Sequence, residues 1–348
     1  MNRRRAALGA LSALLGQSAL PAHAAPTLLA AAAPAPFEPF EFVALGDMPY
    51  GPDAIAGPAY RHLVDQVNAL NPPFTLHVGD FKDGVADCGD AEYALQQRNF
   101  QRFNQALVYT PGDNDWFDCQ RRGDDPLARL AALRQRFFAA PRSLGQRPIV
   151  VQRQPDAMPE FAPYVENLRW THRGVLFATF HTVGPHNGVD APRAAVRAEA
   201  QAREAANAAW IAAAFALARQ QQARALVLAT QAETLIYPDP AKPHKGQVHP
   251  GFAASVERTL LPLAEAAPFP VLLIHGDAHH HIVDRPFRNP QGQPIVNLWR
   301  MEVFGEPRVH AVRVRIGPAG DASAEPFGFS PVWNPLSPDP RMPRQVRP

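Results

Sequence analysis

Four apolar segments of this sequence end in the same dipeptide, a glycine followed by an aspartate. The four dipeptides are Gly46-Asp47, Gly79-Asp80, Gly112-Asp113 and Gly276-Asp277. The segments before them are short and rich in Phe, Val, Leu and Ile, which predicts buried β-strands. A single Gly-Asp after a strand is usually a turn, because both residue types favour turns. Four of them indicate more than turns, since ligands of α/β proteins bind at the carboxyl ends of strands.

Helical patterns separate these strands in the middle of the chain. The predicted helices cover about residues 60–70, 91–105, 126–138, 193–219 and 252–266. A hairpin is predicted on either side of Arg173-Gly174, and the segments 295–304 and 308–316 follow as strands without helices. Alternating strands and helices indicate a layered α/β domain, and the closing strands favour a mixed sheet or a two-sheet sandwich. We therefore expect a layered two-sheet sandwich flanked by helices.

The N-terminal segment has the three parts of a secretory signal peptide. Three arginines precede a short Ala/Leu stretch, and Ala22-His23-Ala24 offers small residues at the positions that a signal peptidase reads. A membrane anchor is the alternative, but the apolar run is short and carries Gly16-Gln17-Ser18. We expect cleavage after Ala24 and a periplasmic or secreted protein. The paired arginines also permit export by the twin-arginine route.

The remaining chain divides by composition into three parts. Residues 25–39 form a Pro/Ala-rich leader, residues 40–316 carry the strand and helix patterns, and residues 317–348 are crowded with proline. We expect the last part to be an extended tail without a fold of its own.

The apparent positive charge of the chain belongs to its signal peptide. Residues 1–24 hold three arginines and no acidic residue, so cleavage would leave 31 of the 34 basic side chains against 32 acidic ones. This balance predicts no nucleic-acid surface and no attraction to an anionic membrane. Once the signal peptide is cleaved, we also expect no stable membrane anchor.

The chain contains two cysteines, Cys88 and Cys119. In an exported protein an isolated pair most simply forms a disulfide, which would contribute about 3–4 kcal/mol in the chain-entropy model. Metal binding is the weaker alternative, because two lone thiols without a CxxC partner make a poor zinc site.

Four carboxylates at one edge of a sheet would repel each other unless cations neutralised them. The Gly-Asp pattern therefore predicts a metal site.

The order and spacing of these motifs resemble the calcineurin-like metallophosphoesterase superfamily. That family carries Asp-x-His, Gly-Asp-x-x-Asp and Gly-Asn-His-Asp/Glu after its first three strands, then a strand ending in His and another ending in Gly-His-x-His. The corresponding segments here are Asp47-Met48-Pro49, Gly79–Asp83, Gly112–Asp115, the strand that ends at Gln231, and Gly276–His279. The resemblance covers about residues 40–315. It implies the family's fold, two divalent metal ions and hydrolysis of a small-molecule phosphate ester.

Several family positions hold a different residue type in this chain. Pro49 stands where the family has a metal-binding histidine, and Asn114 where it has the histidine that protonates the leaving group. Gln231 and Asp277 replace two further histidine ligands, and Asp113 replaces an asparagine. Carried over residue by residue, one metal ion would bind Asp47, Asp80 and His279, and the other would bind Asp80, Asp113, Gln231 and Asp277.

This ligand set determines which ions the resemblance implies. Carboxylate and amide oxygens suit Mg²⁺, Mn²⁺ or Ca²⁺ better than zinc or iron. Two such ions could activate a bridging water and stabilise the charge of a phosphoryl group. Asn114 cannot act as an acid, so esters with good leaving groups are favoured unless His181, His186 or His275 supplies the proton.

The other polar residues have simpler alternatives. On a strand His279 and His281 face one side and His280 the other, so the three cannot easily bind one ion. His62, His77 and His172 lie within helix or strand patterns, which favours structural roles. Asp83 and Asp115 either orient the ligands or cap turns.

Two hypotheses follow for the function. The first is an exported, metal-dependent phosphoesterase. The second is a non-catalytic protein on the same fold that binds a metal ion or a ligand, and Pro49 and Asn114 are the residues that support it.

Overall fold

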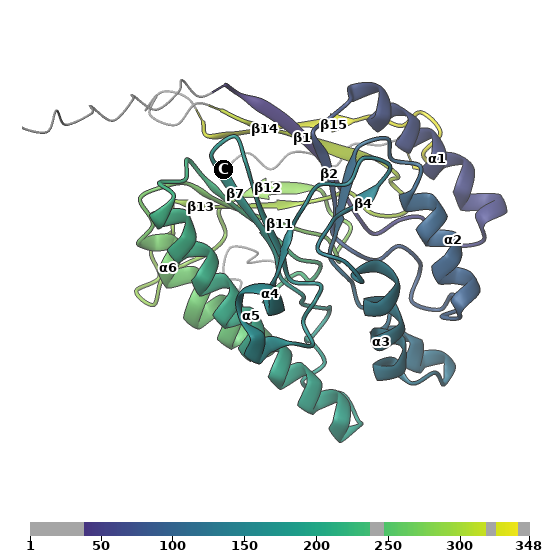
Figure 1. The fold of residues 1–348 in the computed structure, drawn as a ribbon, viewed down its shortest axis with the longest axis horizontal. Helices are drawn as coiled ribbons and strands as arrows, with labels where there is room; N and C mark the ends of the chain where they lie inside the picture. The colour runs from purple at the N-terminus through teal and green to yellow at the C-terminus, as the bar shows by residue number, and fades with distance from the viewer. Residues whose placement is uncertain (1–37, 237–246, 318–324, 340–348) are drawn as a thin grey trace, which may run out of the picture. The chain divides into compact units, whose positions relative to one another are not determined.

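Two large mixed sheets, with helices beside them, form the core of the computed structural model of this chain (Figure 1). The structure describes residues 38–236, 247–317 and 325–339. The expected signal peptide and nearly all of the leader lie outside the described residues. The predicted fold class, a layered two-sheet α/β sandwich flanked by helices, is confirmed.

The first sheet has six strands and contains three of the predicted Gly-Asp strand ends. In spatial order it consists of β15 (Phe327–Val332), β14 (Ala311–Ile316), β1 (Phe40–Leu45), β2 (Phe74–His77), β3 (Ala106–Tyr109) and β4 (Leu144–Gly145). Strands β1, β2 and β3 run parallel, and Leu45 pairs with His77, which in turn pairs with Tyr109. The dipeptides that follow these strands therefore emerge at the same edge of the sheet.

The second sheet has seven strands. In spatial order it consists of β12 (Ile282–Asp284), β13 (Leu298–Glu302), β11 (Val271–His275), β8 (Leu226–Ala229), β7 (Val175–Thr179), β6 (Leu168–His172) and β5 (Gln152–Arg153). Strands β13, β11, β8 and β7 are parallel. The predicted hairpin is confirmed, because β6 and β7 pair antiparallel around Arg173-Gly174. A separate antiparallel pair joins β9 (Leu235–Ile236) to β10 (Gln247–Val248).

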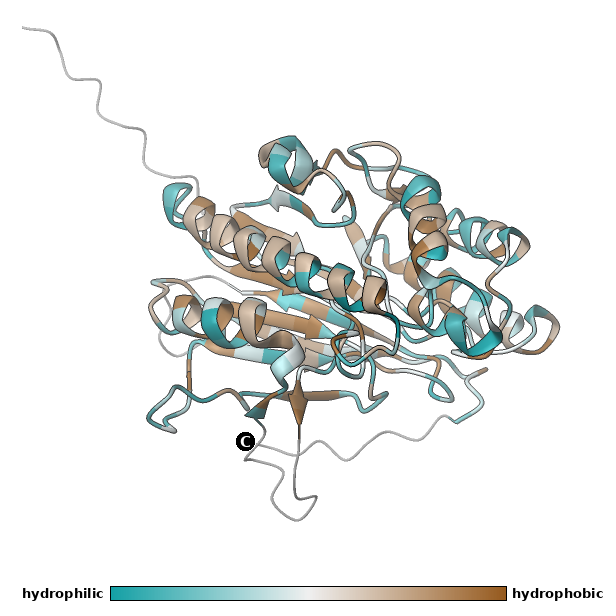
Figure 2. Cartoon of the chain, turned by 90° about the horizontal axis from the view of Figure 1, so that it is seen from below, coloured by the Kyte–Doolittle hydropathy of each residue, from teal (hydrophilic) through white to brown (hydrophobic). Residues whose placement is uncertain are grey.

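Each large sheet has its own set of helices (Figures 1 and 2). The helices beside the first sheet are α1 (Asp53–Leu70), α2 (Asp90–Phe100) and α3 (Pro126–Phe137). The second sheet carries α5 (Ala194–Gln220), a π-helical segment η5 (Ala253–Leu260) and α6 (Leu261–Glu265). Shorter elements are η1 (Phe117–Arg122), α4 (Gln154–Ala157), η2 (Pro159–Phe161) and η4 (Pro250–Phe252). Among the described residues, no helix is long and apolar enough to cross a membrane.

Strand periodicity divides the core into two apolar layers. Leu176 and Ala178 of β7 point toward α5 and pack in a cluster with Trp210. Phe177, which lies between them, points the other way and contacts Phe42 of the first sheet, with ring centroids 5.4 Å apart. Burial on both faces explains why the central strands are continuous apolar runs rather than alternating ones.

The C-terminal part differs from the predicted tail. Residues 327–332 form β15, the edge strand of the first sheet, and pair antiparallel with β14. The sheet therefore extends past residue 316, where the predicted domain ended. The proline content of this segment is compatible with a strand because an edge strand leaves one side of its backbone unpaired.

Candidate metal centre

The four Gly-Asp dipeptides lie at strand ends, as predicted. They follow β1, β2, β3 and β11 respectively. The first three strands belong to one sheet and β11 to the other. The amide of Asp277 donates a hydrogen bond of 3.0 Å to Oδ1 of Asp47, so the strand ends of the two sheets are in direct contact.

The glycines explain why the dipeptide recurs. Three of the aspartates have left-handed backbone angles, with φ of 52° at Asp47, 55° at Asp80 and 82° at Asp277, which is uncommon for residues with a Cβ atom. A side chain at Gly112 would overlap the carboxylate of Asp80, and one at Gly276 would overlap that of Asp47. These glycines leave the space that a carboxylate from another strand end occupies.

One amide group joins two of the predicted ligands. Nε2 of Gln231 donates to Oδ2 of Asp80 at 3.2 Å and to Oδ1 of Asp113 at 3.1 Å. The two carboxylates therefore share a single hydrogen-bond donor, and all three side chains are buried. A metal ion has the size and charge to bridge oxygens that lie this close together.

His279 lies on the Asp47 side of the cluster. Its Nδ1 is 2.7 Å from the carbonyl oxygen of Glu306, which fixes the ring so that Nδ1 carries the proton. Nε2 then presents its lone pair 3.8 Å from Oδ1 of Asp47. Burial lowers the pKa of His279, which keeps the ring neutral as a metal ligand requires.

The carboxylates are held where ionisation without a cation is unfavourable. Burial raises the pKa of Asp47, Asp80 and Asp113 well above the usual range, and the repulsion of neighbouring carboxylates raises it further. Burial also raises the pKa of Asp277 to about 6. Among the described residues, no lysine or arginine forms an ion pair with any of the four.

The residues present fit hard divalent cations. The cluster offers carboxylate oxygens and one imidazole nitrogen, and Oδ2 of Asp47 is buried without a hydrogen-bond partner in the described part of the chain. An unpaired buried carboxylate oxygen is costly unless a cation compensates for it. Oxygen-rich sets of this kind suit Mg²⁺, Mn²⁺ or Ca²⁺.

The structure places Gln231 in the cluster but not as the predicted ligand. Its Oε1 accepts a hydrogen bond of 3.0 Å from the amide of Gly184, and this contact turns the nitrogen toward the carboxylates. An amide nitrogen carries no free lone pair for a metal ion. In this orientation Gln231 is a hydrogen-bond donor to the ligands rather than a ligand.

Asn114 lies at the cluster together with Tyr50, which the sequence analysis did not single out. Nδ2 of Asn114 donates to Oδ2 of Asp80 and to the hydroxyl oxygen of Tyr50, both at 2.9 Å. The Tyr50 hydroxyl lies 3.2 Å from Oδ2 of Asp80 and 3.4 Å from Nε2 of His279. Its position directly after Pro49 was the available signal, because Pro49 stands where the resembled family has a histidine.

The structure places His181 in a buried hydrogen-bond network rather than at the cluster. The ring is fully buried, with Nε2 accepting from the indole of Trp116 at 3.1 Å and Nδ1 2.8 Å from Glu166. Arg134 binds both oxygens of the Glu166 carboxylate, including the Oε1 that His181 contacts. Both ring nitrogens of His181 are therefore committed to structural contacts.

The other two predicted donors lie beside the cluster rather than in it. Nδ1 of His186 is 2.6 Å from Asp190, and its ring stacks on that of His249 with centroids 4.1 Å apart. His275 precedes the fourth dipeptide but is fully buried, and its Nδ1 contacts the carbonyl oxygen of Gly276 at 2.8 Å. Neither ring makes a hydrogen bond to the clustered carboxylates.

The two candidate supporting aspartates have different roles. Asp115 is fully buried and accepts hydrogen bonds from the amides of Asp80 and Phe81, so it orients a predicted ligand. Asp83 accepts from the amides of Gly51 and Val85, which is a turn role.

The remaining histidines have structural surroundings. His77 is buried and accepts from the amide of Gly79, and His172 packs against Phe40. His281 stacks on a phenyl ring of the following loop, with centroids 4.3 Å apart.

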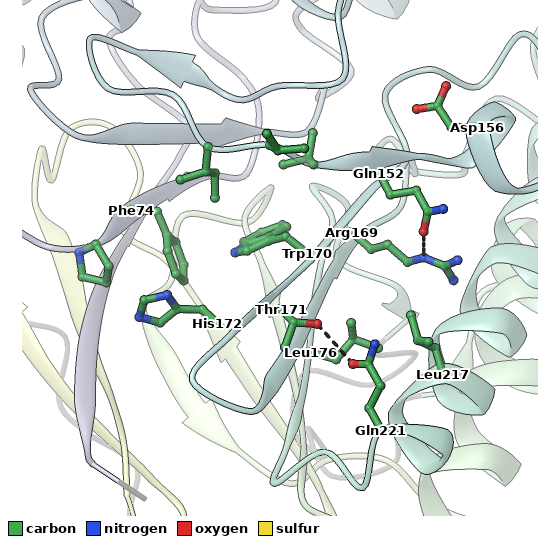
Figure 3. A pocket seen from close by; sticks show the side chains of 14 residues that line it. Phe74, Gln152, Asp156, Arg169, Trp170, Thr171, His172, Leu176, Leu217 and Gln221 are labelled. Carbon is green, nitrogen blue, oxygen red and sulfur yellow. Dashed lines mark hydrogen bonds between the residues drawn. The ribbon is translucent and has the colours of Figure 1, made fainter. Parts of the chain in front are cut away.

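Two cavities differ in their relation to the carboxylates. A cavity of about 550 Å³ is lined by Phe74 and Trp170 (Figure 3). Phe74 begins β2, so this cavity lies at the opposite end of the strand from Asp80. A second cavity of about 680 Å³ is lined by Arg121, His186 and Arg193 among others, and it adjoins the loop of Gly184, which packs against the Asp277 carboxylate.

A disulfide braces the strand ends. Cys88 and Cys119 are joined, with Cα atoms 5.8 Å apart, which confirms the predicted pairing. Cys88 lies between β2 and α2, and Cys119 lies in η1 after β3. The bond therefore connects the segments that follow Asp80 and Asp113.

Comparisons with known proteins give matches among solved structures only. A search of protein-family models finds no match, and a search of curated proteins finds none. The chain is similar to a dimetal phosphatase from Danio rerio, with 9% identity, a TM-score of 0.47 and coverage of 84% of this chain and 98% of the other. It is also similar to the purple acid phosphatase PPD1 of yellow lupin seeds, with 10% identity, a TM-score of 0.44 and coverage of 85% and 55%. A 5'-nucleotidase from Candida albicans matches with 10% identity, a TM-score of 0.38 and coverage of 85% and 52%. Similarities at this level do not determine what this chain binds or catalyses.

Proposed function

We propose that this chain is a divergent calcineurin-like metallophosphoesterase that hydrolyses phosphate mono- or diesters by means of a metal-activated water. The observation that carries the proposal is the convergence of three buried aspartates, Asp47, Asp80 and Asp113, with the half-buried Asp277 in one cluster. Burial and the repulsion of neighbouring carboxylates both oppose the ionisation of these side chains. Their ionised forms therefore require cations to compensate the charge. The strands that carry them also follow the order of the family's motifs.

Each residue of the cluster has a role in this proposal. Asp47 and His279 would bind one ion, Asp113 and Asp277 the other, and Asp80 would contact both. When bound, two such ions neutralise charge on the phosphoryl group and lower the pKa of a water. Gln231 donates hydrogen bonds to two of the carboxylates, which holds Asp80 and Asp113 next to each other.

Tyr50 is the proton donor that we infer for the leaving group. Burial raises its pKa well above the usual range, so the hydroxyl keeps its proton at neutral pH. It lies within hydrogen-bond distance of Asp80 and of Asn114, the residue at the family's acid position. An alkoxide leaving group is more basic than a phenolate, which makes a phenol a competent acid toward it.

The cavity beside the cluster supports a small anionic substrate. Arg121 pairs with Asp118 at 2.8 Å and Arg193 with Asp125 at 2.8 Å, and both guanidinium groups are about half exposed. Arginine is well suited to phosphate oxygens because its donors are arranged as a planar fork. A phosphate ester lying in this cavity would adjoin the loop of Gly184, which packs against the Asp277 carboxylate.

Export forms part of the proposal. The signal-peptide pattern of residues 1–24 motivates it, and the disulfide is compatible with an oxidising compartment. Mass spectrometry of the mature protein from the periplasm should give an N-terminus at Ala25; an N-terminus at Met1 would overturn export.

Metal content and hydrolysis together test the proposed activity. The purified protein should contain divalent metal by elemental analysis and hydrolyse members of a phosphate-ester panel in the presence of Mn²⁺, Mg²⁺ or Ca²⁺. Chelation should abolish the hydrolysis, and metal addition should restore it. Bound metal without hydrolysis of any ester would reject the enzyme.

One observation favours the alternative of a non-catalytic binding protein. Oδ2 of Asp80 already accepts hydrogen bonds from Tyr50, Asn114 and Gln231. Such a set of donors can hold a carboxylate without a metal ion. Full occupancy by metal in the absence of activity would support this alternative.

A further inference from the structure

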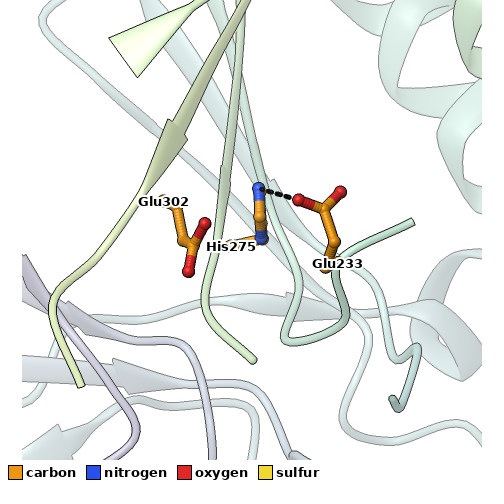
Figure 4. Close-up of side chains that lie close together, drawn as sticks. All are labelled: Glu233, His275 and Glu302. Atoms are coloured by element: carbon orange, nitrogen blue, oxygen red, sulfur yellow. Dashed lines mark ion pairs between the residues drawn. The ribbon is translucent and has the colours of Figure 1, made fainter. Parts of the chain in front are cut away.

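A second group of possible metal ligands lies at the strand ends of the second sheet. Glu233 follows β8, His275 ends β11 and Glu302 ends β13. These three strands are parallel neighbours, and His275 and Glu302 are register partners. One ligand atom from each side chain lies within 4.8 Å of the other two (Figure 4).

The imidazole of His275 is oriented for ligation. Its Nδ1 contacts the carbonyl oxygen of Gly276 at 2.8 Å, so this nitrogen carries the proton and Nε2 bears the lone pair. Nε2 is buried and has no hydrogen-bond partner in the described part of the chain. The nearest carboxylate oxygen, Oε2 of Glu233, is 4.0 Å away, which is too far for a hydrogen bond. A buried nitrogen lone pair without a partner is unfavourable, and a cation would satisfy it.

The two glutamates are held in place from outside the group. Oε2 of Glu233 accepts from Arg300 at 2.7 Å, and Oε1 accepts from the amide of Leu235 at 3.0 Å. Oε1 of Glu302 accepts from the amide of His280 at 2.6 Å. Outer contacts of this kind orient the ligands of protein metal sites.

The local charge favours a cation. Arg300 pairs with Glu233 and with Asp284, both at 2.7 Å, so its guanidinium group already balances two carboxylates. Among residues 38–236, 247–317 and 325–339, these are the charged contacts around Arg300, and Glu302 adds a third carboxylate close by. Glu302 is buried and forms no ion pair with a lysine or arginine among the described residues. A divalent ion would offset the excess of negative charge in this group.

We propose that Glu233, His275 and Glu302 bind a divalent transition-metal ion, separate from the ions proposed between Asp47 and Asp113. One imidazole with two carboxylates is a set that suits Zn²⁺, Mn²⁺ or Co²⁺, in contrast to the oxygen-rich centre beside it. The amide of Glu233 donates to Oδ2 of Asp277 at 2.9 Å. An ion here would therefore fix the turn that carries Asp277, and its binding does not depend on phosphoesterase activity.

Cobalt titration of the metal-free protein tests this site. We would remove metals with a chelator, add Co²⁺, and measure both the bound ion per chain and the visible d–d absorption. His275→Gln and Glu302→Gln should each lose about one equivalent of Co²⁺, because each removes one of three protein ligands. Circular dichroism would establish that both variants are folded, and Glu233→Gln would replace either one that is not.

The matched control is His310→Gln. His310 is also buried with an unpartnered Nε2, but its Nδ1 accepts from the amide of Asn334, and among the described residues it belongs to no group of three possible metal ligands. This variant should keep the wild-type stoichiometry.

The outcomes separate this site from the proposed active centre. Asp80→Asn should lose the ions of the active centre and keep the ion at His275. If Asp80→Asn loses bound Co²⁺ while His275→Gln and Glu302→Gln bind as much as the wild type, the additional site is overturned and the proposed function stands. The reverse pattern would leave the additional site standing and show that cobalt binding does not depend on Asp80. A wild-type protein that binds no cobalt would overturn the additional site, while the proposed function would still be tested by hydrolysis with Mn²⁺, Mg²⁺ or Ca²⁺.

Discussion

The carboxylate of Asp115 accepts a hydrogen bond from the backbone amide of Asp80, with Oδ2 3.1 Å from the nitrogen. The same oxygen accepts from the hydroxyl of Tyr109 at 2.7 Å and from the amide of Gly112 at 2.8 Å. Asp115 thus supports the left-handed turn at Asp80 and the glycine before Asp113 at the same time. Its role is to position two predicted ligands rather than to bind an ion itself.

Replacement of Asp115 by Asn should destabilise the fold. The variant keeps the shape of the side chain but replaces one carboxylate oxygen by an NH2 group, which cannot accept a hydrogen bond. Buried donors that now bind this oxygen would lose their acceptor, and each unsatisfied buried donor costs about 1–3 kcal/mol. We expect a loss of about 3 kcal/mol or more in the free energy of unfolding, measured by urea denaturation. Asp83→Asn is the control, and its partly exposed turn contacts should cost about 1 kcal/mol or less.

Replacement of Asp80 by Ala should remove metal-dependent hydrolysis and weaken metal binding. Asp80 is the single carboxylate that would contact both proposed ions, and its neighbours place it at the middle of the cluster. Elemental analysis and hydrolysis of a nitrophenyl ester would be measured on the same samples. Asp65→Ala, on the exposed side of α1, should change neither. Retained metal and activity in Asp80→Ala would exclude this centre as the active site.

The strand ends could be predicted from the sequence because they depend on local physics. Apolar runs of strand length, followed by glycine, specify both the strand and the turn. Parallel pairing then brings Asp47, Asp80 and Asp113 to one edge of the first sheet, whereas Asp277 joins them through the packing of the second sheet against the first. The structure adds the reason for the glycines, which is the close approach of Asp80 to Gly112 and of Asp47 to Gly276.

Side-chain partners could not be predicted in the same way. His181 follows a strand, which made it a candidate proton donor, but its nitrogens contact Trp116 and Glu166, which lie on other elements of the chain. The orientation of Gln231 depends on the amide of Gly184, in a loop of another strand. These contacts arise from tertiary packing, which the local pattern does not encode.

The stability of the metal-free protein should fall as the pH rises through about 6. Burial raises the pKa of Asp277 to about 6 in the folded state, so between its ordinary pKa and this value the folded state holds a proton that the unfolded state has released. The stabilisation is therefore complete at low pH and is lost as the pH rises through the folded pKa. A shift of this size corresponds to about 3 kcal/mol, and the raised pKa values of Asp47, Asp80 and Asp113 act in the same direction.

Urea denaturation over this pH range, with EDTA or with Mn²⁺, would measure the effect. Bound Mn²⁺ stabilises the ionised carboxylates, so the fall should disappear or reverse when the metal is present. If the free energy of unfolding in EDTA instead rose with pH, the aspartates could not have the raised pKa values that burial without a cation gives them.

Replacement of Tyr50 by Phe tests the proton donor. If its hydroxyl protonates the leaving group, the variant should lose about 10²-fold in kcat on alkyl phosphate esters and much less on nitrophenyl esters, whose leaving groups need no proton. The control is Tyr60→Phe, which removes a buried hydroxyl without a hydrogen-bond partner in the described residues. Equal losses on both ester classes would mean that Tyr50 only positions Asp80.

Replacement of Asn114 by His would restore the group that the resembled family uses as its acid. Nδ2 of Asn114 lies 2.9 Å from Oδ2 of Asp80, so an imidazole at this position would reach the same region of the cluster. General acid catalysis contributes typically about 10²–10⁴-fold, so even a poorly placed imidazole should raise turnover of alkyl esters more than that of nitrophenyl esters. Its pH profile should fall as the imidazole loses its proton, because only the protonated ring can donate. Equal gains on both ester classes would show that position 114 affects geometry rather than proton transfer. Absence of activity in both wild type and Asn114→His, despite bound metal, would favour the non-catalytic binding protein.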